Sequence, residues 1–244
     1  MSSAAVSAAT ESELVDKLLQ VVDRINAKTT DLQNTINDKL GWLPGFLQGK
    51  VVAGWNKFCD FMRKVWDFWT EVCNNMGSPS KLWATADAWS DTVGAPVSAQ
   101  VQSADTGLLT VDDNWDGDAA NAYRQTLPLQ KTALDKVKTT LTDGISTALS
   151  DVAKGIIAFW ASLVVALAAL VGGIIGAIAS AATIFGLPAA PFIAAGAALA
   201  ADAAVIGGGM ILKSVCSGAS TALRQRLDDN AGFHEGHWPP AAKY

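Results

Sequence analysis

Two amphipathic helices are predicted in the first third of the chain. Between residues 12 and 40, apolar side chains recur at spacings of three, four and seven, which places them on one helical stripe: Leu14, Leu18, Val21, Ile25, Leu32, Ile36 and Leu40. Gly41, Pro44, Gly45 and Gly49 then predict a short turn. Helical spacing resumes after it, in a segment with a wide aromatic arc: Trp55, Phe58, Met62, Val65, Trp69 and Val72.

A second pair of helices is predicted to form an antiparallel hairpin. Helical spacing runs from Leu82 to Leu108 and again from Leu134 to Val152, and the polar residues 112–118 between them predict a turn. Helices joined by so short a connection pack side by side. Proline lacks the backbone N–H and its ring clashes with the preceding turn. We therefore expect Pro96 to kink or divide the first helix, and Pro128 to separate the first turns of the second helix from the rest.

An apolar hairpin is predicted next. No Asp, Glu, Lys, Arg or His occurs between Lys154 and Asp202, and a bilayer span needs about 20 predominantly apolar residues. The stretch is long enough for two spans, at about 156–185 and 191–212, with a turn that contains Pro188 and Pro191. Lys154 precedes the first span and Lys213 follows the second, so both ends are expected on one face of a membrane.

Small residues recur every four positions in both predicted spans. One row is Ala169, Gly173, Ala177 and Ala181, and the other is Gly196, Ala200, Ala204 and Gly208. Such rows let helix backbones approach closely in lipid. The alternative is that the same hairpin is the tightly packed centre of a soluble bundle, covered by the amphipathic helices of residues 12–75.

Asp202 lies inside the second predicted span. A carboxylate in hydrocarbon is unfavourable and usually faces a bundle interior or water. Asp202 is therefore either a pore-lining or oligomer-contact residue, or a residue near a helix surface with no particular role.

Composition narrows the class of protein. Eighteen basic against 23 acidic residues give a net charge of −5, only 17% of residues are charged, and the mean hydropathy is +0.24. These values exclude a disordered chain, and the acidic balance without a basic block argues against nucleic acid as a partner. Three cysteines do not suit a disulfide scaffold. The N-terminus lacks the basic and apolar regions of a Sec signal, so any export is expected by a non-Sec route.

No catalytic, metal or cofactor site is predicted. The two histidines, His234 and His237, lack the spacing of zinc ligands on one helix face. The glycine pairs and triplet, at 172–173 and 207–209, lie in apolar helices without the Lys-Ser/Thr that follows a phosphate loop. Paired carboxylates at 112–113 and 228–229 have no partner for acid–base chemistry. The sequence therefore predicts no enzyme and no cofactor.

The predicted turn carries a recognisable motif. Residues 114–123 read Asn-Trp-Asp-Gly-Asp-Ala-Ala-Asn-Ala-Tyr. Trp115 and Gly117 form a Trp-x-Gly motif. Asn114 precedes this motif, and Asp118, the alanines and Tyr123 follow it. We expect Gly117 to permit a sharp turn, Asp116 or Asp118 to cap the next helix, and Trp115 to close the end of the hairpin core.

Over residues 82–152 the chain resembles the WXG family of type VII (ESX) secretion substrates of actinobacteria and related bacteria. The resemblance implies a helical hairpin that pairs with a second WXG-type chain and is recognised by the export ATPase. The family's export signal, Tyr-x-x-x-Asp/Glu, is absent after Trp115, because Leu127 lies four residues after Tyr123. Either a partner chain carries the signal or this protein is recognised differently. Larger members that share this plan are exported effectors with a toxic or membrane-active module.

We predict an all-α, elongated helical bundle with four segments: amphipathic, Trp-rich helices at 1–78, a WXG-like hairpin at 79–153, a membrane-competent apolar hairpin at 154–216 and a flexible tail at 217–244. The Trp-rich segment 42–73 either shelters the apolar hairpin or lies at a membrane interface.

The predicted function is that of a secreted, pore-forming or otherwise membrane-active toxin that is soluble before export and then inserts the apolar hairpin. Its expected partners are a lipid bilayer, the type VII export machinery, a WXG-type chain and further copies of itself. Two alternatives remain at this point. One is a resident integral membrane protein, and the other is a soluble assembly protein that uses the WXG-like hairpin to bind partners.

Overall fold

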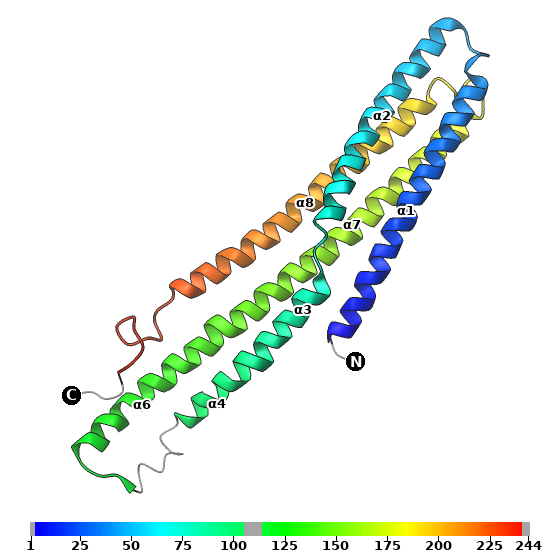
Figure 1. Ribbon diagram of the computed structural model, residues 1–244. Helices are drawn as coiled ribbons and strands as arrows, with labels where there is room; N and C mark the ends of the chain where they lie inside the picture. The colour runs from blue at the N-terminus through cyan, green and yellow to red at the C-terminus, as the bar shows by residue number, and fades with distance from the viewer. Residues whose placement is uncertain (1–2, 105–113, 241–244) are drawn as a thin grey trace. The chain divides into compact units, whose positions relative to one another are not determined.

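The computed structural model describes residues 3–104 and 114–240, with side chains described from residue 8. The described residues are predominantly helical, and their only β-type pairing is an isolated bridge between His234 and His237. The predicted all-α fold class is confirmed. The helices are α1 (Ser3–Leu40), α2 (Gly45–Asn74), α3 (Pro79–Ala88), α4 (Ala95–Ser103), α6 (Asp118–Lys136), α7 (Asp143–Ala181) and α8 (Ala190–Asp228) (Figure 1).

The chain divides into two compact units. One unit, here called the four-helix unit, contains Ala5–Ser78 and Gly155–Lys213. The other, the motif unit, consists mainly of Pro79–Lys154 and Ser214–Tyr244. The amphipathic N-terminal helices therefore belong with the apolar hairpin and not with the WXG-like hairpin. The division falls at Lys154 and Lys213, the two lysines that bound the predicted spans.

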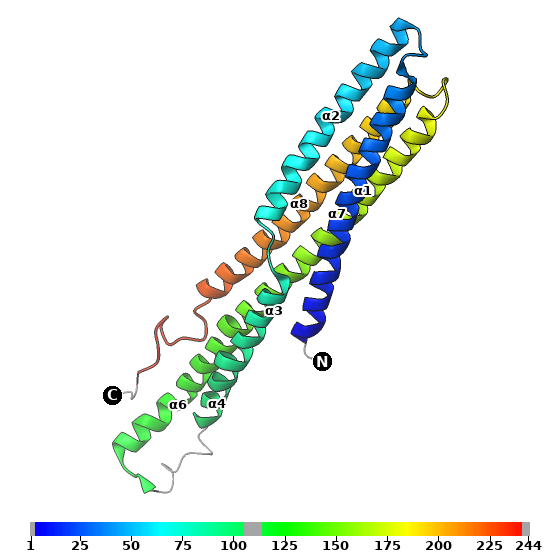
Figure 2. The same cartoon turned by 45° about the vertical axis from the view of Figure 1, so that its right-hand side comes forward.

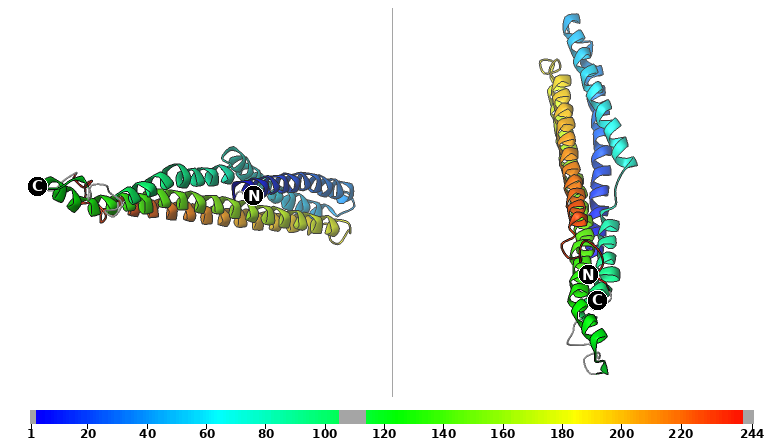
Figure 3. Two further views of the ribbon diagram at one scale, coloured as in Figure 1. Left: turned by 90° about the horizontal axis from the view of Figure 1, so that it is seen from below. Right: turned by 90° about the vertical axis from the view of Figure 1, so that its left-hand side faces the viewer.

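The four-helix unit has two layers. Figure 3 shows α1 and α2 on one side and the apolar parts of α7 and α8 on the other. Contacts join the layers along their length: Gly54 of α2 packs on Pro191 and Phe192 of α8, and the Phe68 ring of α2 lies 6.4 Å from the Phe159 ring of α7 in an edge-on arrangement. The outer side of the α7–α8 layer has no covering helix within this unit.

Helix α1 is built on the predicted stripe. Leu18, Ile25 and Leu32 are seven residues apart and fully buried, whereas most residues between them are exposed. Burial of each such side chain contributes about 1.5–3 kcal/mol. Helix α2 repeats the arrangement after the predicted turn and buries five residues at helical spacing: Val51, Gly54, Phe58, Met62 and Val65. Both predicted amphipathic helices are confirmed, and α1 begins earlier than expected, at Ser3.

The α1–α2 turn and the α7–α8 turn lie at the same end of the four-helix unit (Figures 1 and 2). Lys39 near the end of α1 joins them, because its Nζ donates to the carbonyl oxygens of Ala182, at 2.5 Å, and Ala181, at 3.4 Å. The last carbonyls of a helix have no partner within the helix, and a cation there also complements the helix dipole. Helix α7 ends at Ala181, four residues before the predicted end of the first span.

In the motif unit, α4 packs antiparallel to α6, as the predicted hairpin requires, and a π-helical segment lies in each arm. The segment η1 (Trp89–Gly94) comes directly before Pro96, and Ala95 donates its N–H to Ser90. Pro96 follows in the first turn of α4, directly after the widened π-helical turn. Helical residues run without a break from α3 through η1 into α4, so Pro96 does not divide the predicted helix.

The opposite arm has its π-helical segment at η3 (Val137–Thr142), and the two segments touch. A Cβ on Gly94 would lie 3.0 Å from Cγ2 of Thr142, and Ser90 and Ser146 share a hydrogen bond of 3.2 Å between their hydroxyl oxygens. The widened turns of the two arms therefore lie against each other.

The expectation that Pro128 separates the start of the second helix is wrong. Pro128 lies inside α6, which continues without interruption through η3 into α7. An internal proline removes one backbone hydrogen bond and costs about 3 kcal/mol. Packing on both sides of it offsets this cost, because Thr126 and Leu127 before it and Ala133 after it are buried.

The expectation of a flexible tail from residue 217 is also wrong for its first part, because α8 continues to Asp228. Arg226 lies across α7 and packs on Gly144, while its guanidinium donates to the carbonyl oxygen of Thr139 at 3.2 Å. These contacts hold the end of α8 against the motif unit's long helix. Turns follow from residue 229, and Lys136 pairs with Asp229.

Leu32 and Leu19 provide a matched test of the α1 packing. Leu32→Ala is expected to lower the free energy of unfolding by about 2–5 kcal/mol, since it leaves a cavity at a fully buried site. Leu19→Ala, on the same helix but 50% exposed, is expected to change it by less than about 0.5 kcal/mol. Urea unfolding followed by circular dichroism measures both, and equal effects would contradict the assigned face.

Candidate functional site

The outer face of the apolar hairpin is the most unusual surface of the four-helix unit. Exposed large hydrophobic side chains recur along it: Val165, Ile175, Ile193, Leu199, Ile206, Met210 and Ile211. In the most apolar 18-residue stretch of each of the two candidate spanning helices, only 39% and 28% of the stretch is buried. The core helix of a soluble protein would be mostly buried. By length and composition both helices are able to cross a membrane.

The inner face of the hairpin is packed like a protein core. In α7, Leu163, Leu167, Leu170 and Ile174 are buried at helical spacing. In α8 the buried positions are small, with Ala194, Ala198 and Ala201 among them. Each helix therefore has two apolar faces, one covered by protein and one open.

The α7–α8 contact depends on small residues at two points. A Cβ on Gly173 would overlap the Cβ of Ala197. A Cβ on Gly208 would lie 2.9 Å from Oγ of Ser162 and 3.3 Å from the Phe159 ring. Of the first predicted row, Ala177 and Ala181 are fully buried, whereas Ala169 is exposed.

Of the second predicted row, only Gly208 contacts α7 in this structure, and Ala204 is exposed. Gly196 and Ala200 are exposed, and a Cβ on Gly196 would have no neighbour within 4 Å. A step of four residues turns about 40° further than one full turn of a helix, so four such positions spread over about 120°. The buried face of α8 instead follows alternating steps of three and four.

The predicted turn with two prolines is present but is shifted toward the N-terminus. It covers residues 182–189, contains Pro188, and leaves Pro191 buried in the first turn of α8. Hydrogen bonds within the turn occupy many of its backbone groups: Gly186 N–H donates to Oγ1 of Thr183, and the Gly186 carbonyl accepts from Oγ of Ser180, both at 3.0 Å. Gly186 is required there, because a Cβ would overlap the Ser180 carbonyl oxygen.

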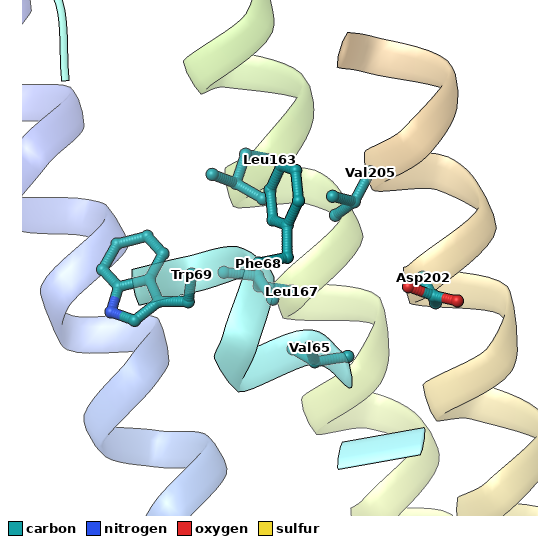
Figure 4. A pocket seen from close by; sticks show the side chains of 7 residues that line it. All are labelled: Val65, Phe68, Trp69, Leu163, Leu167, Asp202 and Val205. Atoms are coloured by element: carbon teal, nitrogen blue, oxygen red, sulfur yellow. The ribbon is translucent and has the colours of Figure 1, made fainter. Parts of the chain in front are cut away.

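Asp202 lies at an apolar recess between α2, α7 and α8 (Figure 4). It is the only charged residue of the lining, whose other members are Val65, Phe68, Trp69, Leu163, Leu167 and Val205. Asp202 is half-buried, and no hydrogen bond or ion pair joins it to another residue in the described part of the chain. Its carboxylate therefore depends on solvent at the margin of the recess.

The Trp-x-Gly turn is ordered by a small set of contacts in the motif unit. Gly117 has φ 106° and ψ −177°, a backbone conformation essentially restricted to glycine, and its carbonyl accepts the Asn121 N–H at 3.1 Å. The Trp115 ring packs on Tyr123 with centroids 5.9 Å apart. Arg124 donates to the Trp115 carbonyl at 3.0 Å.

Two expectations for this turn are corrected. Trp115 is 42% exposed and packs on Tyr123 at the start of α6, so it does not close a buried core. The N-cap of α6 is Gly117, which has no side chain to cap with, and Asp118 is the first helical residue. Its negative charge still complements the positive end of the helix dipole. Asn114 lies just before the motif, and the predicted turn residues 112–113 are outside the described residues.

Charged contacts attach the C-terminal turns to α6. The hydrogen bond from Lys136 lowers the pKa of Asp229, with a further contribution from the Ala231 N–H. Within the same arm, the hydrogen bond to Asp143, at 2.8 Å, raises the pKa of Lys138. The expectation that the carboxylates 228–229 have no basic partner is therefore wrong for Asp229, which pairs with Lys136.

His234 and His237 belong to a tight turn after α8, where they form the isolated bridge. Within residues 3–104 and 114–240, no group of three or more His, Cys, Asp or Glu side chains is arranged to hold a metal ion. The thiols of Cys59 and Cys73 have raised pKa values, mainly through burial, which disfavours the reactive thiolate.

Comparison with known proteins adds no relative: no family model, curated protein or solved structure matches the chain.

Sequence reasoning missed the exposed aromatic residues in the two turns of the four-helix unit. Trp42 and Phe46 flank the buried Leu43, and Phe185 precedes the buried Leu187. Large apolar side chains inside Gly- and Pro-rich turns are the signal that marks them, since such turns are usually polar.

Gly117→Ala is expected to destabilise the motif unit by about 1–3 kcal/mol, because an L side chain is strained at φ 106°. Gly218→Ala is the control: that position is exposed and helical, with no atom within 4 Å of an added Cβ, so a neutral or slightly stabilising effect is expected. Denaturant unfolding with far-ultraviolet circular dichroism compares them. Equal stability of both variants would rule out the strained turn.

Gly173→Ala and its neighbour Gly172→Ala test the close approach of α7 and α8. The first is expected to destabilise the four-helix unit by about 1–3 kcal/mol, since the added methyl meets Ala197. The second points into open space and is expected to be neutral or stabilising, because alanine favours helix more than glycine does. Thermal unfolding measures both, and a stabilising Gly173→Ala would show that the helices are not in contact there.

Proposed function

We propose that this protein is a membrane-active effector that is soluble before export and then inserts the α7–α8 hairpin into a bilayer, where it oligomerises. The observation that carries the proposal is the uncovered apolar face of the hairpin, from Val165 on α7 to Met210 on α8, opposite the face covered by α1 and α2. Monomeric soluble proteins rarely expose so extended an apolar surface.

The dimensions of the hairpin suit a bilayer. At about 1.5 Å per residue, residues 155–181 extend about 40 Å and residues 190–213 about 36 Å, compared with a hydrocarbon core of about 30 Å. All the backbone hydrogen bonds inside a helix are made within the segment, so lipid leaves them intact. Lys154 and Lys213 mark one end of the pair, and the uncharged turn 182–189 marks the other.

The energetic balance favours lipid for the outer face. Removing each large exposed side chain from water contributes up to about 1.5–3 kcal/mol. The inner face exchanges contacts with α1 and α2 for contacts with lipid, which is nearly neutral for apolar side chains. The opposing terms are the separation of the two layers and the exposure of Leu18, Phe58 and similar side chains of α1 and α2.

Oligomerisation in the membrane is proposed to use the exposed small residues of α8. Gly196 and Ala200 face outward, away from the α7 contact, and so remain available for close approach by a second copy. Asp202, two residues further, would then lie near the junction between copies or a water-filled path.

The proposed route out of the cell is type VII secretion. It is supported by the resemblance of the Trp115–Gly117 turn to WXG substrates and by the ordered helical hairpin that contains it. The proposed partners are the export ATPase and a WXG-type chain. Appearance of the protein in culture supernatant only when the ATPase is functional would support this route. Retention in the membrane fraction would instead favour a resident membrane protein.

The insertion step is tested with a reversible lock. A Cβ on Gly54 would lie 3.0 Å from the Cβ of Pro191, which is shorter than the Cβ separation of about 3.5–4.5 Å in disulfides. A small outward shift of α2 therefore lets Gly54→Cys with Pro191→Cys tie α2 to α8. The native cysteines at 59, 73 and 216 are replaced by serine. Purified without detergent, the oxidised variant is expected to release no dye from liposomes, and the reduced variant is expected to release it.

The control for the lock is Gly54→Cys alone, for which oxidation should have no effect. Large defined particles without any dye release, from the wild-type protein, would contradict insertion and favour a soluble assembly protein whose apolar faces meet between copies. A deletion of the whole hairpin is a poorer test, because it removes the core on which α1 and α2 pack.

A further inference from the structure

The end of the four-helix unit that carries both turns presents exposed apolar side chains. Phe185 is 98% exposed, Phe46 71% and Trp42 67%, and Ile184 lies beside Phe185. The Lys39 hydrogen bonds to Ala181 and Ala182 show that the two turns are neighbours, and Figures 1 and 2 agree. We call these four apolar residues the tip.

The tip is held in place by its own turns. In the α1–α2 turn, Leu43 is buried, and its carbonyl accepts a hydrogen bond of 2.8 Å from Nε2 of Gln48. In the α7–α8 turn, Leu187 is fully buried, and its N–H donates to the Thr183 carbonyl at 3.0 Å. Each turn thus anchors one leucine inward and directs aromatic side chains outward without any rearrangement of α1 and α2.

The charges around the tip are positive, although the whole chain has a net charge of −5. Between Asp38 and Asp60 the charged residues are Lys39, Lys50 and Lys57, and the α7–α8 turn has none. Lys50 and Lys57 are exposed, in the second and fourth turns of α2. Asp38 is the one acidic residue in the last two turns of α1. Aromatic residues flanked by lysines suit a surface of anionic lipid headgroups over an apolar interior.

We propose that the tip docks on an anionic bilayer while the four-helix unit is still closed, and so precedes insertion of the hairpin. The role of docking as a step before insertion rests on the proposed function. Docking itself does not require the four-helix unit to open. Docking would place the uncharged α7–α8 turn at the headgroups, and this turn is the part of the hairpin that must cross first. Its internal hydrogen bonds suit that path, since unpaired backbone groups are costly in lipid.

The oxidised, locked variant tests docking separately from insertion. Sedimentation with phosphatidylcholine vesicles that contain phosphatidylglycerol is expected to show binding without dye release. Trp42→Ser, Phe46→Ser and Phe185→Ser combined in the locked protein are expected to weaken this binding by about tenfold or more, because affinity follows the apolar area that enters the interface.

A matched control uses side chains of similar exposure elsewhere on the same unit. Val165, Met210 and Ile211 are 69%, 67% and 66% exposed, and their replacement by serine should leave the binding of the locked protein unchanged. Replacing Lys50 and Lys57 by glutamine should weaken binding by about fivefold per lysine, and added salt or vesicles of phosphatidylcholine alone should reduce it as well.

The outcomes separate the two proposals. If the locked protein fails to bind while the reduced protein releases dye, docking by the tip is overturned and insertion stands. If the control replacements weaken binding as much as the tip replacements do, the outer face and not the tip is the docking surface. If neither form binds or releases dye, both proposals fail. Circular dichroism of each variant verifies that the helices are retained.

Discussion

The structure of the four-helix unit depends on one constraint, which is that α7 and α8 are apolar on every side between Lys154 and Asp202. A helix with a single apolar stripe is satisfied by one packed layer, but these two helices are not. Helices α1 and α2 each provide one stripe and cover the inner face with Leu18, Ile25, Phe58 and Met62. The outer face is left to water, a bilayer or another chain.

In the proposed function, the covering layer and a lipid phase are alternative surroundings for the hairpin. Small residues at Gly173 and Gly208 bring α7 and α8 into direct contact that involves neither α1 nor α2. Contact between small residues persists in lipid, whereas the packing of α1 and α2 on the hairpin is driven by removal of apolar area from water. The proposed transition therefore breaks the contact between the α1–α2 layer and the α7–α8 layer, and it keeps the contact between α7 and α8.

The motif unit has a different character. It holds most of the chain's charge, its arms meet through paired π-helical segments, and its turn is fixed by the backbone of Gly117 and the Trp115–Tyr123 contact. Exposure of Trp115 leaves an aromatic surface beside Arg124 at the end of the hairpin. Such an end is suited to recognition by another protein, which agrees with the proposed role in export and is separate from the membrane step.

The sequence by itself determined the helices, the long apolar hairpin and the position of the Trp-x-Gly turn, because periodicity and the absence of charge are local properties of the chain. Tertiary structure decided which helices cover the hairpin, since many amphipathic stripes have the same spacing. It also kept Pro128 inside α6 through the burial of Leu127 and Ala133, and it selected the contact row of α8, because a four-residue repeat drifts around a helix. The tip is likewise formed only by the tertiary structure. Trp42 and Phe185 are far apart in the chain, and they share one end because α1 and α7 run in the same direction and Lys39 of α1 caps the end of α7.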